Sequence, residues 1–110
     1  MEQQQYTKRD MRLFREKLPT WQEAYMERLC KEYVKLLSGE GKPSERFWEL
    51  DKRIKEDKKH TGVRCTTSRS DLILLVTNLL CEDAITMEDL SDFSEVFHKT
   101  LEEYRRIWRV

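Results

Sequence analysis

Glycine and proline are scarce in this sequence, with 3 glycines and 2 prolines among 110 residues. Folds built from many short strands need turn residues more often, so this scarcity favours long helices with few connections. The length fits one domain. We therefore predict an all-α fold, a small single-domain helical bundle over residues 7–110 that follows a disordered N-terminus at residues 1–6.

Cysteine and long apolar runs are also lacking. The 3 cysteines are an odd number without a Cys-x-x-Cys pair, which is typical of a reducing compartment and not of a disulfide framework. No apolar run approaches the roughly 20 residues that cross a bilayer, and the polar first residues lack a signal-peptide pattern. We expect a cytoplasmic protein with no membrane contact, and its small size and charge density suggest a bacterial or phage origin.

Net charge is absent as well, because 21 basic residues balance 21 acidic ones. No global field therefore draws the protein to nucleic acid, and only local charge asymmetry would do so. Charged and apolar residues each make up 38% of the chain. This apolar content, with its helical periodicity, excludes a disordered chain.

The most apolar stretch runs from Leu72 to Cys81. Its apolar side chains fall on every side of a helix, which predicts a central helix at about 69–82 surrounded by other elements. Ser68 and Asp71 are the predicted capping pair of this helix. Four main helices and a short N-terminal helix are expected in total.

Two of these helices are predicted before residue 40. The short one begins at Thr7, with Asp10 as its capping partner. It ends at Pro19, because proline disfavours helical geometry at the residue before it. The next helix begins with a capping box of Thr20 and Glu23 and ends at the glycines after residue 38.

Two further helices flank the central one. Ser44 is expected to cap a peripheral helix that ends near His60. The narrow apolar stripe of this helix consists of Phe47, Leu50 and Ile54. The last helix, at about 87–108, follows a capping pair of Thr86 and Asp89, with Ile85 and Leu90 placed as a hydrophobic staple.

Charge is unevenly spread along the chain. Residues 52–69 hold seven Lys and Arg against two acids, and residues 82–103 hold eight acids against one lysine. A basic segment before a helix N-terminus would suit an anion, because free N–H groups and the helix dipole favour negative charge there. The candidate anion or nucleic-acid contacts are Lys58, Lys59, Arg64, Thr67, Ser68 and Arg69. The alternative is a solvated loop that pairs with the acidic last helix.

Arg53 and His60 stand seven positions apart on one charged helix. This spacing resembles the Arg-x4-6-His signature of the all-helical HEPN ribonucleases. The resemblance covers these two residues and implies RNA cleavage by them. It departs from the family in position, because the family motif begins a late helix, whereas here it closes the third.

No other constellation indicates a cofactor or catalysis. The 2 histidines and 3 cysteines lie far apart and lack metal-ligand spacing. We therefore expect a non-enzymatic interaction or regulatory module without cofactor or small-molecule substrate, which binds a protein partner or a second copy through helix faces. Trp48 lies off the apolar stripe of its helix, so it either packs on Pro43 or is the candidate partner anchor. Nucleic-acid binding through residues 52–69 and HEPN-like ribonuclease activity are the alternatives.

Overall fold

The computed structural model describes residues 4–65 and 72–108. Within these ranges the chain forms no strands and four α-helices, which confirms the all-α prediction with four main helices. A short 3₁₀ helix, η2, precedes the last of them. The elements are α1 (Lys8–Ser38), α2 (Pro43–Asp57), α3 (Leu72–Cys81), η2 (Met87–Leu90) and α4 (Glu95–Trp108).

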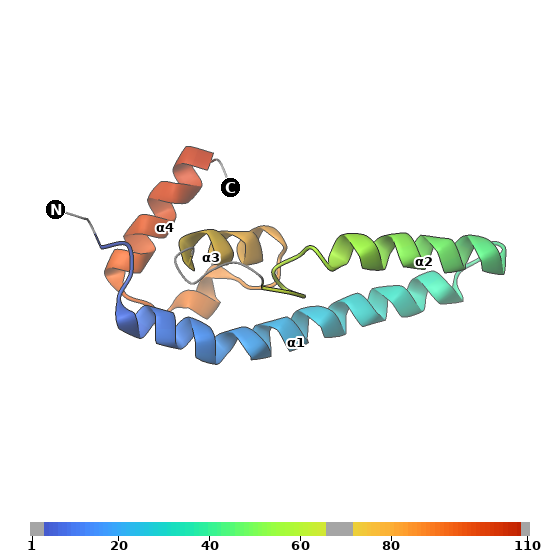
Figure 1. Cartoon of the computed structure of the whole chain (residues 1–110), viewed down its shortest axis with the longest axis horizontal. Helices are drawn as coiled ribbons and strands as arrows, with labels where there is room; N and C mark the ends of the chain where they lie inside the picture. The colour runs from blue at the N-terminus through green and yellow to red at the C-terminus, as the bar shows by residue number, and fades with distance from the viewer. Residues whose placement is uncertain (1–3, 66–71, 109–110) are drawn as a thin grey trace.

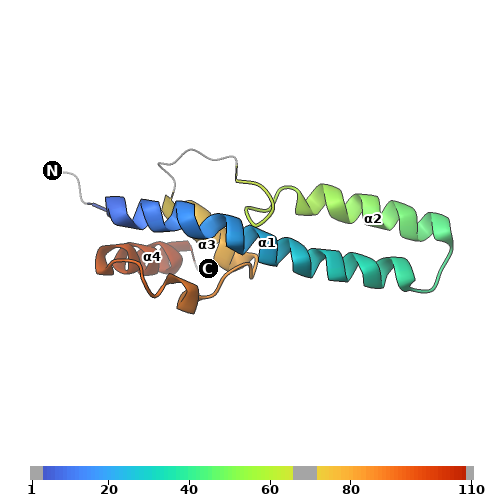
Figure 2. The same cartoon turned by 90° about the horizontal axis from the view of Figure 1, so that it is seen from below.

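The molecule is elongated, with extents of 60 × 27 × 23 Å. α1 runs along most of its length, and its second half pairs antiparallel with α2 (Figure 1). The first half of α1 lies beside α3 and α4, as the perpendicular view also shows (Figure 2). We call residues 25–57 the hairpin, and residues 4–24 with 72–108 the head.

The hydrophobic core lies in the head. Leu72, Val76 and Leu79 of α3 are fully buried against Phe97 and Leu101 of α4. Burying an aliphatic or aromatic side chain contributes roughly 1.5–3 kcal/mol, so these helices dominate the stability of the fold. In the hairpin, by contrast, the only buried apolar side chains among the described residues are those of Tyr25 and Leu29.

The predicted end of the first helix at Pro19 is wrong. α1 is one continuous helix from Lys8 to Ser38 with Pro19 inside it, so Thr20 does not begin a second helix. A proline in a helix interior costs about 3 kcal/mol. Leu18 and Trp21 pack against the core on both sides of Pro19, and this burial offsets the cost. The predicted start at Thr7 is confirmed, with a complete capping box.

The predicted last helix is interrupted. The capping box of Thr86 and Asp89 forms, but it opens the 3₁₀ helix η2, and α4 begins only at Glu95. Ser94 provides a second start, because its Oγ accepts a hydrogen bond from the N–H of Phe97 at 3.2 Å. Ser94 is held in turn by Asp10 of α1, so a tertiary contact decides where α4 begins.

α3 is not enclosed on every side as predicted. Leu75 is buried, but Leu74 is 37% exposed and Cys81 is also exposed. The predicted extension of this helix before Leu72, with its Ser68–Asp71 capping pair, lies outside the described residues. α2 also begins differently, with Lys42 as its N-cap and Pro43 in the first turn in place of a Ser44 cap.

Candidate functional site

The hairpin carries an unusual share of exposed apolar surface. Four large apolar side chains near its tip are 46–65% exposed, namely Val34, Leu37, Phe47 and Trp48. The prediction that Phe47 is buried is therefore wrong. α2 turns Leu50 and Ile54 toward α1, whereas Phe47, on the same side of α2 but nearer the tip, stays 61% exposed.

A groove of about 240 Å³ lies between the two helices of the hairpin. It is lined from α1 by Met26, Leu29, Cys30 and Tyr33, from α2 by Ile54, Asp57 and Lys58, and from the following turn by Val63. Leu37 follows Tyr33 by four residues and Phe47 precedes Ile54 by seven. Both spacings keep side chains on one side of a helix, so Leu37 and Phe47 extend the apolar rows of the groove toward the tip.

We call this surface the hairpin face. It comprises Met26, Cys30, Tyr33, Val34, Leu37, Phe47, Trp48 and Ile54. The rings of Phe47 and Trp48 meet edge to face, with centroids 4.9 Å apart. Arg46 fixes the tip by donating hydrogen bonds to the carbonyl oxygens of Leu37 and Gly39. Trp48, the anchor expected from the sequence, lies on this surface with 65% of its area exposed.

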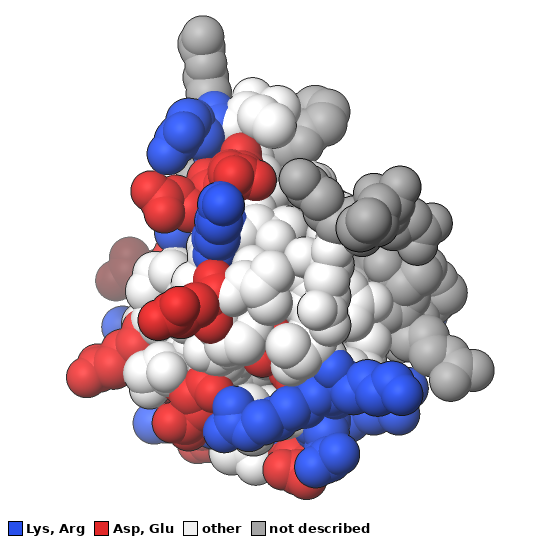
Figure 3. Space-filling view, turned by 90° about the vertical axis from the view of Figure 1, so that its left-hand side faces the viewer, with Lys and Arg blue, Asp and Glu red and all other residues white. Residues whose placement is uncertain are grey.

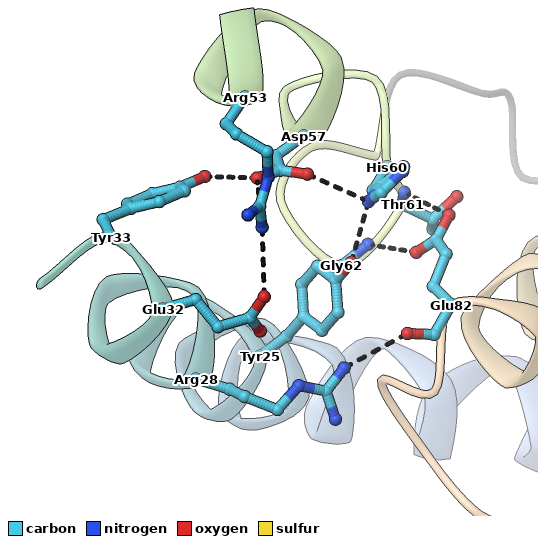
Figure 4. Close-up of polar contacts among 10 residues, drawn as sticks. All are labelled: Tyr25, Arg28, Glu32, Tyr33, Arg53, Asp57, His60, Thr61, Gly62 and Glu82. Carbon is cyan, nitrogen blue, oxygen red and sulfur yellow. Dashed lines mark hydrogen bonds and ion pairs between the residues drawn. The ribbon is translucent and has the colours of Figure 1, made fainter. Parts of the chain in front are cut away.

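A polar cluster around Asp57 joins the two helices of the hairpin (Figure 4). The Asp57 carboxylate is almost buried and accepts a 2.5 Å hydrogen bond from the hydroxyl of Tyr33. Burial, together with this hydrogen bond, raises the pKa of Tyr33 above its ordinary value. The guanidinium of Arg53 lies 3.0 Å from Glu32 and 3.7 Å from Asp57, so it bridges α1 and α2.

The base of the hairpin is tied to the head by the turn after α2. The hydroxyl of Tyr25 and Nδ1 of His60 share a 2.7 Å hydrogen bond. The Glu82 carboxylate accepts 2.9 Å bonds from the backbone N–H groups of Thr61 and Gly62 (Figure 4). Burial, and then the negative charge of Glu82, raises the pKa of Tyr25.

The structure brings Arg53 and His60, the HEPN-like pair, close together, and both side chains contact other residues. Nδ1 of His60 lies 3.9 Å from the Asp57 carboxylate and shares its hydrogen bond with Tyr25. Arg53 faces the same carboxylate from the other side and is also held by Glu32. The contacts of both side chains therefore connect α1, α2 and the turn that follows.

The basic candidates are only partly described. Lys58, Lys59 and Arg64 are exposed in and after the last turn of α2, whereas Thr67, Ser68 and Arg69 lie outside the described residues. Lys55 in the same segment is paired with Asp51 at 2.9 Å. The end of the head away from the hairpin carries both signs of charge (Figure 3). There, basic side chains gather along one edge, and acidic and basic side chains alternate along another.

Comparison with known protein families, with curated proteins and with solved structures finds no match for this chain. In residues 4–65 and 72–108, no group of three His, Cys, Asp or Glu side chains is placed to hold a metal ion. Within those ranges, no helix combines the length and apolarity that a membrane span requires.

Sequence reasoning missed most of the hairpin face. Met26, Cys30, Val34 and Leu37 were not among the candidate site residues. A signal was present, because Met26, Cys30 and Val34 follow one another at four-residue spacing directly beside a charged row. Such a second apolar row exceeds what a single neighbouring helix covers.

Proposed function

We propose that this protein is a non-enzymatic interaction module that docks a protein partner on the hairpin face. The observation that carries the proposal is the gathering of Val34, Leu37, Phe47 and Trp48, each 46–65% exposed, at one end of the molecule. Exposed apolar side chains gathered at one place on a surface mark an interaction site. Single exposed apolar residues are ordinary, and the head carries such scattered examples in Leu74, Met87 and Ile107.

The shape of the site favours a helical partner. A groove between two antiparallel helices accepts the apolar face of a third helix, as in helix-in-groove recognition. The aromatic pair at the tip is suited to anchor such a partner, because tryptophan and other aromatic residues contribute disproportionately to binding energy. In this proposal Arg53 and His60 hold the hairpin in shape and have no role in RNA cleavage.

Site-specific photo-crosslinking in the native cell tests the proposal. A photoreactive phenylalanine analogue replaces Phe47 in one variant and Ile107, which is 73% exposed in the head, in a control variant. We expect one discrete adduct from position 47 and none from position 107. Equal labelling from both positions, or none from either, would contradict docking at the hairpin face.

Binding by the purified partner gives the second measurement. We expect Phe47→Ser and Trp48→Ser each to weaken binding at least tenfold in calorimetry, because aromatic anchors carry about 2 kcal/mol or more. Ile107→Ser is the matched control and should leave the affinity unchanged. Retention of full affinity by both hairpin variants would show that the partner binds elsewhere.

Nucleic-acid binding is a second candidate, favoured by three exposed cations within residues 58–64. Lys58, Lys59 and Arg64 form no ion pair with any residue that the structure describes. Neutralising phosphates would make binding fall with added salt. Fluorescence anisotropy with labelled DNA and RNA tests this candidate. The absence of binding would eliminate this candidate. Binding that is insensitive to salt, and unchanged when all three cations are replaced by Glu, would eliminate it as well.

A further inference from the structure

A charged row runs along α1 beside the exposed apolar row of the hairpin face. Glu23, Glu27, Lys31 and Lys35 follow one another at four-residue spacing, and all four are exposed. The neighbouring row holds Met26, Cys30 and Val34, and the last two of these are exposed. An apolar strip with a charged rim is the arrangement of a helix that pairs with another helix.

The order of charges along this row is informative. The two acids come first and the two lysines follow, so Glu23 and Lys35 are equally far from residue 29, as are Glu27 and Lys31. An identical helix packed antiparallel about that point would set each glutamate opposite a lysine. A parallel copy would set like charges together. The row is therefore complementary to itself in one orientation, as a two-fold interface requires.

We propose that the occupant of the hairpin face is a second copy of this chain, with α1 packed antiparallel to α1 of the first copy. This inference rests on the proposed docking function and names its partner. The two-fold axis passes near residue 29, beside Cys30. Each aromatic tip of Phe47 and Trp48 then points toward the base of the other hairpin, where Met26 and Val63 line the groove.

The size of the face places the proposed dimer among small interfaces. The 15 residues of α2 make the hairpin face about 22 Å long, and two helices make it about 20 Å wide. The resulting area of roughly 400–500 Å² per copy is below the 800 Å² or so of a standard interface. We expect a reversible dimer, because small interfaces belong to weak and transient complexes.

Sedimentation of the full chain over a range of concentrations tests the inference. Glu23→Lys with Glu27→Lys makes the row all basic, and Lys31→Glu with Lys35→Glu makes it all acidic. Each variant alone sets like charges opposite one another, so we expect its dissociation constant to rise about tenfold or more. An equimolar mixture of the two variants restores opposite charges, and we expect the dimer to return.

A matched control uses an ion pair in the head. Glu102 and Arg106 form an exposed i,i+4 pair like that of Glu27 and Lys31. Glu102→Lys removes this pair and should leave dimerisation unchanged. The inference is overturned if the unaltered chain stays monomeric to several hundred micromolar. It is overturned equally if the charge variants dimerise like the unaltered chain, or if their mixture stays monomeric.

Cysteine crosslinking gives a readout of register. Cys30 lies beside the proposed axis and its side chain is exposed. In a chain carrying Cys65→Ser and Cys81→Ser, a short bismaleimide should link two copies through Cys30. We expect no link in either charge variant alone and a link in their mixture. A control chain keeps Cys81 as its only cysteine. If this chain is linked and the Cys30 chain is not, the contact between copies lies elsewhere.

The two proposals fail in different ways. One outcome is a photo-adduct from position 47 that contains a different protein, together with a chain that is monomeric in sedimentation. This outcome contradicts the proposal of a second copy and leaves the proposed docking function intact. A position-47 adduct made of two copies supports both. The absence of any adduct from position 47 removes the docking function itself.

Discussion

Asp10 is a fully buried charged side chain, with an exposed fraction of 0%. Its carboxylate accepts hydrogen bonds from the backbone N–H groups of Thr7 and Ser94, both at 2.8 Å, and from the hydroxyl of Ser94 at 2.6 Å. Burial by itself would raise the pKa of Asp10, but these hydrogen bonds outweigh it and lower the pKa below its ordinary value. One carboxylate thereby joins the first turn of α1 to the start of α4.

Asp10→Asn should destabilise the fold by about 1–3 kcal/mol at pH 7, because an amide cannot accept all three bonds and brings two donors of its own. The pKa of Asp10 is lower in the folded state, so its stabilisation is present above the unfolded pKa of about 3.9 and is lost as pH falls through the folded value. Urea unfolding at pH 7 and below pH 4 measures both effects. The variant should lose less stability in acid than the parent chain, and equal free energies of unfolding at pH 7 would contradict the assignment.

Gly62 is required where the turn after α2 meets the ring of Tyr25. A Cβ atom at position 62 would lie 2.4 Å from Cδ2 of Tyr25. Gly62→Ala therefore displaces the ring and the hydrogen bond of Tyr25 to His60, and we expect a loss of about 1–3 kcal/mol in thermal or urea unfolding. Gly39→Ala is the control, because a Cβ there would meet only Leu36 and Lys35 oxygens at 3.4 and 3.6 Å. Equal stability of the two variants would mean that the ring moves without cost.

Local signals in the sequence identified some of the helix starts. The capping boxes at Thr7 and Thr86 both form, because each depends on residues three positions apart. The predicted helix end at Pro19 and the predicted continuous last helix at about 87–108 were wrong for the opposite reason. Packing against the core carries α1 through Pro19, and a bond to the distant Asp10 fixes the start of α4 at Ser94. Neither contact is visible in a short window of sequence.

The candidate site was harder to predict than the fold. Periodicity shows that a helix has an apolar row, but not whether another element covers it. Trp48 stood out because it lies off the stripe of α2, whereas Phe47 was assigned to that stripe and is 61% exposed. The deciding fact is that the hairpin extends beyond the head, so each of its helices has one packed neighbour among the described elements (Figure 1).

The two flanks of α3 predict different responses to the same substitution. Leu75 is 3% exposed and belongs to the core, whereas Leu74 is 37% exposed. We expect Leu75→Ala to cost about 2–5 kcal/mol in a denaturation curve, because it leaves a cavity among packed side chains. Leu74→Ala should cost less than about 1 kcal/mol. Similar losses from the two variants would show that both flanks of α3 are covered in solution.

The molecule divides its stability unequally between head and hairpin. Apolar burial holds the head together, while the hairpin depends on Tyr25, Leu29 and the polar contacts of Asp57. Segments with few buried apolar contacts open locally at lower free energy than a core. An exposed docking surface on such a segment can adjust to a partner while the head stays folded.

Glu82 is the residue through which head and hairpin should be separable. It follows the end of α3 and holds the turn after α2 by two backbone N–H groups at 2.9 Å. Glu82→Gln removes the charge and one acceptor oxygen, so one of these N–H groups loses its partner. We expect hydrogen exchange in α2 and residues 60–64 to accelerate about tenfold through local opening, with protection in α3 unchanged.

Glu56→Gln, an exposed change in α2, is the control for this experiment and should leave all exchange rates as they are. The measurement depends on comparing the exchange rates of α2 in the hairpin with those of α3 in the head. If α3 lost protection by the same factor as α2, the two parts would open as a single cooperative unit. The polar contacts at the base of the hairpin would then couple the unfolding of the hairpin to that of the head. If only α2 and the turn respond, Glu82 holds the docking surface in place without contributing to the fold of the head.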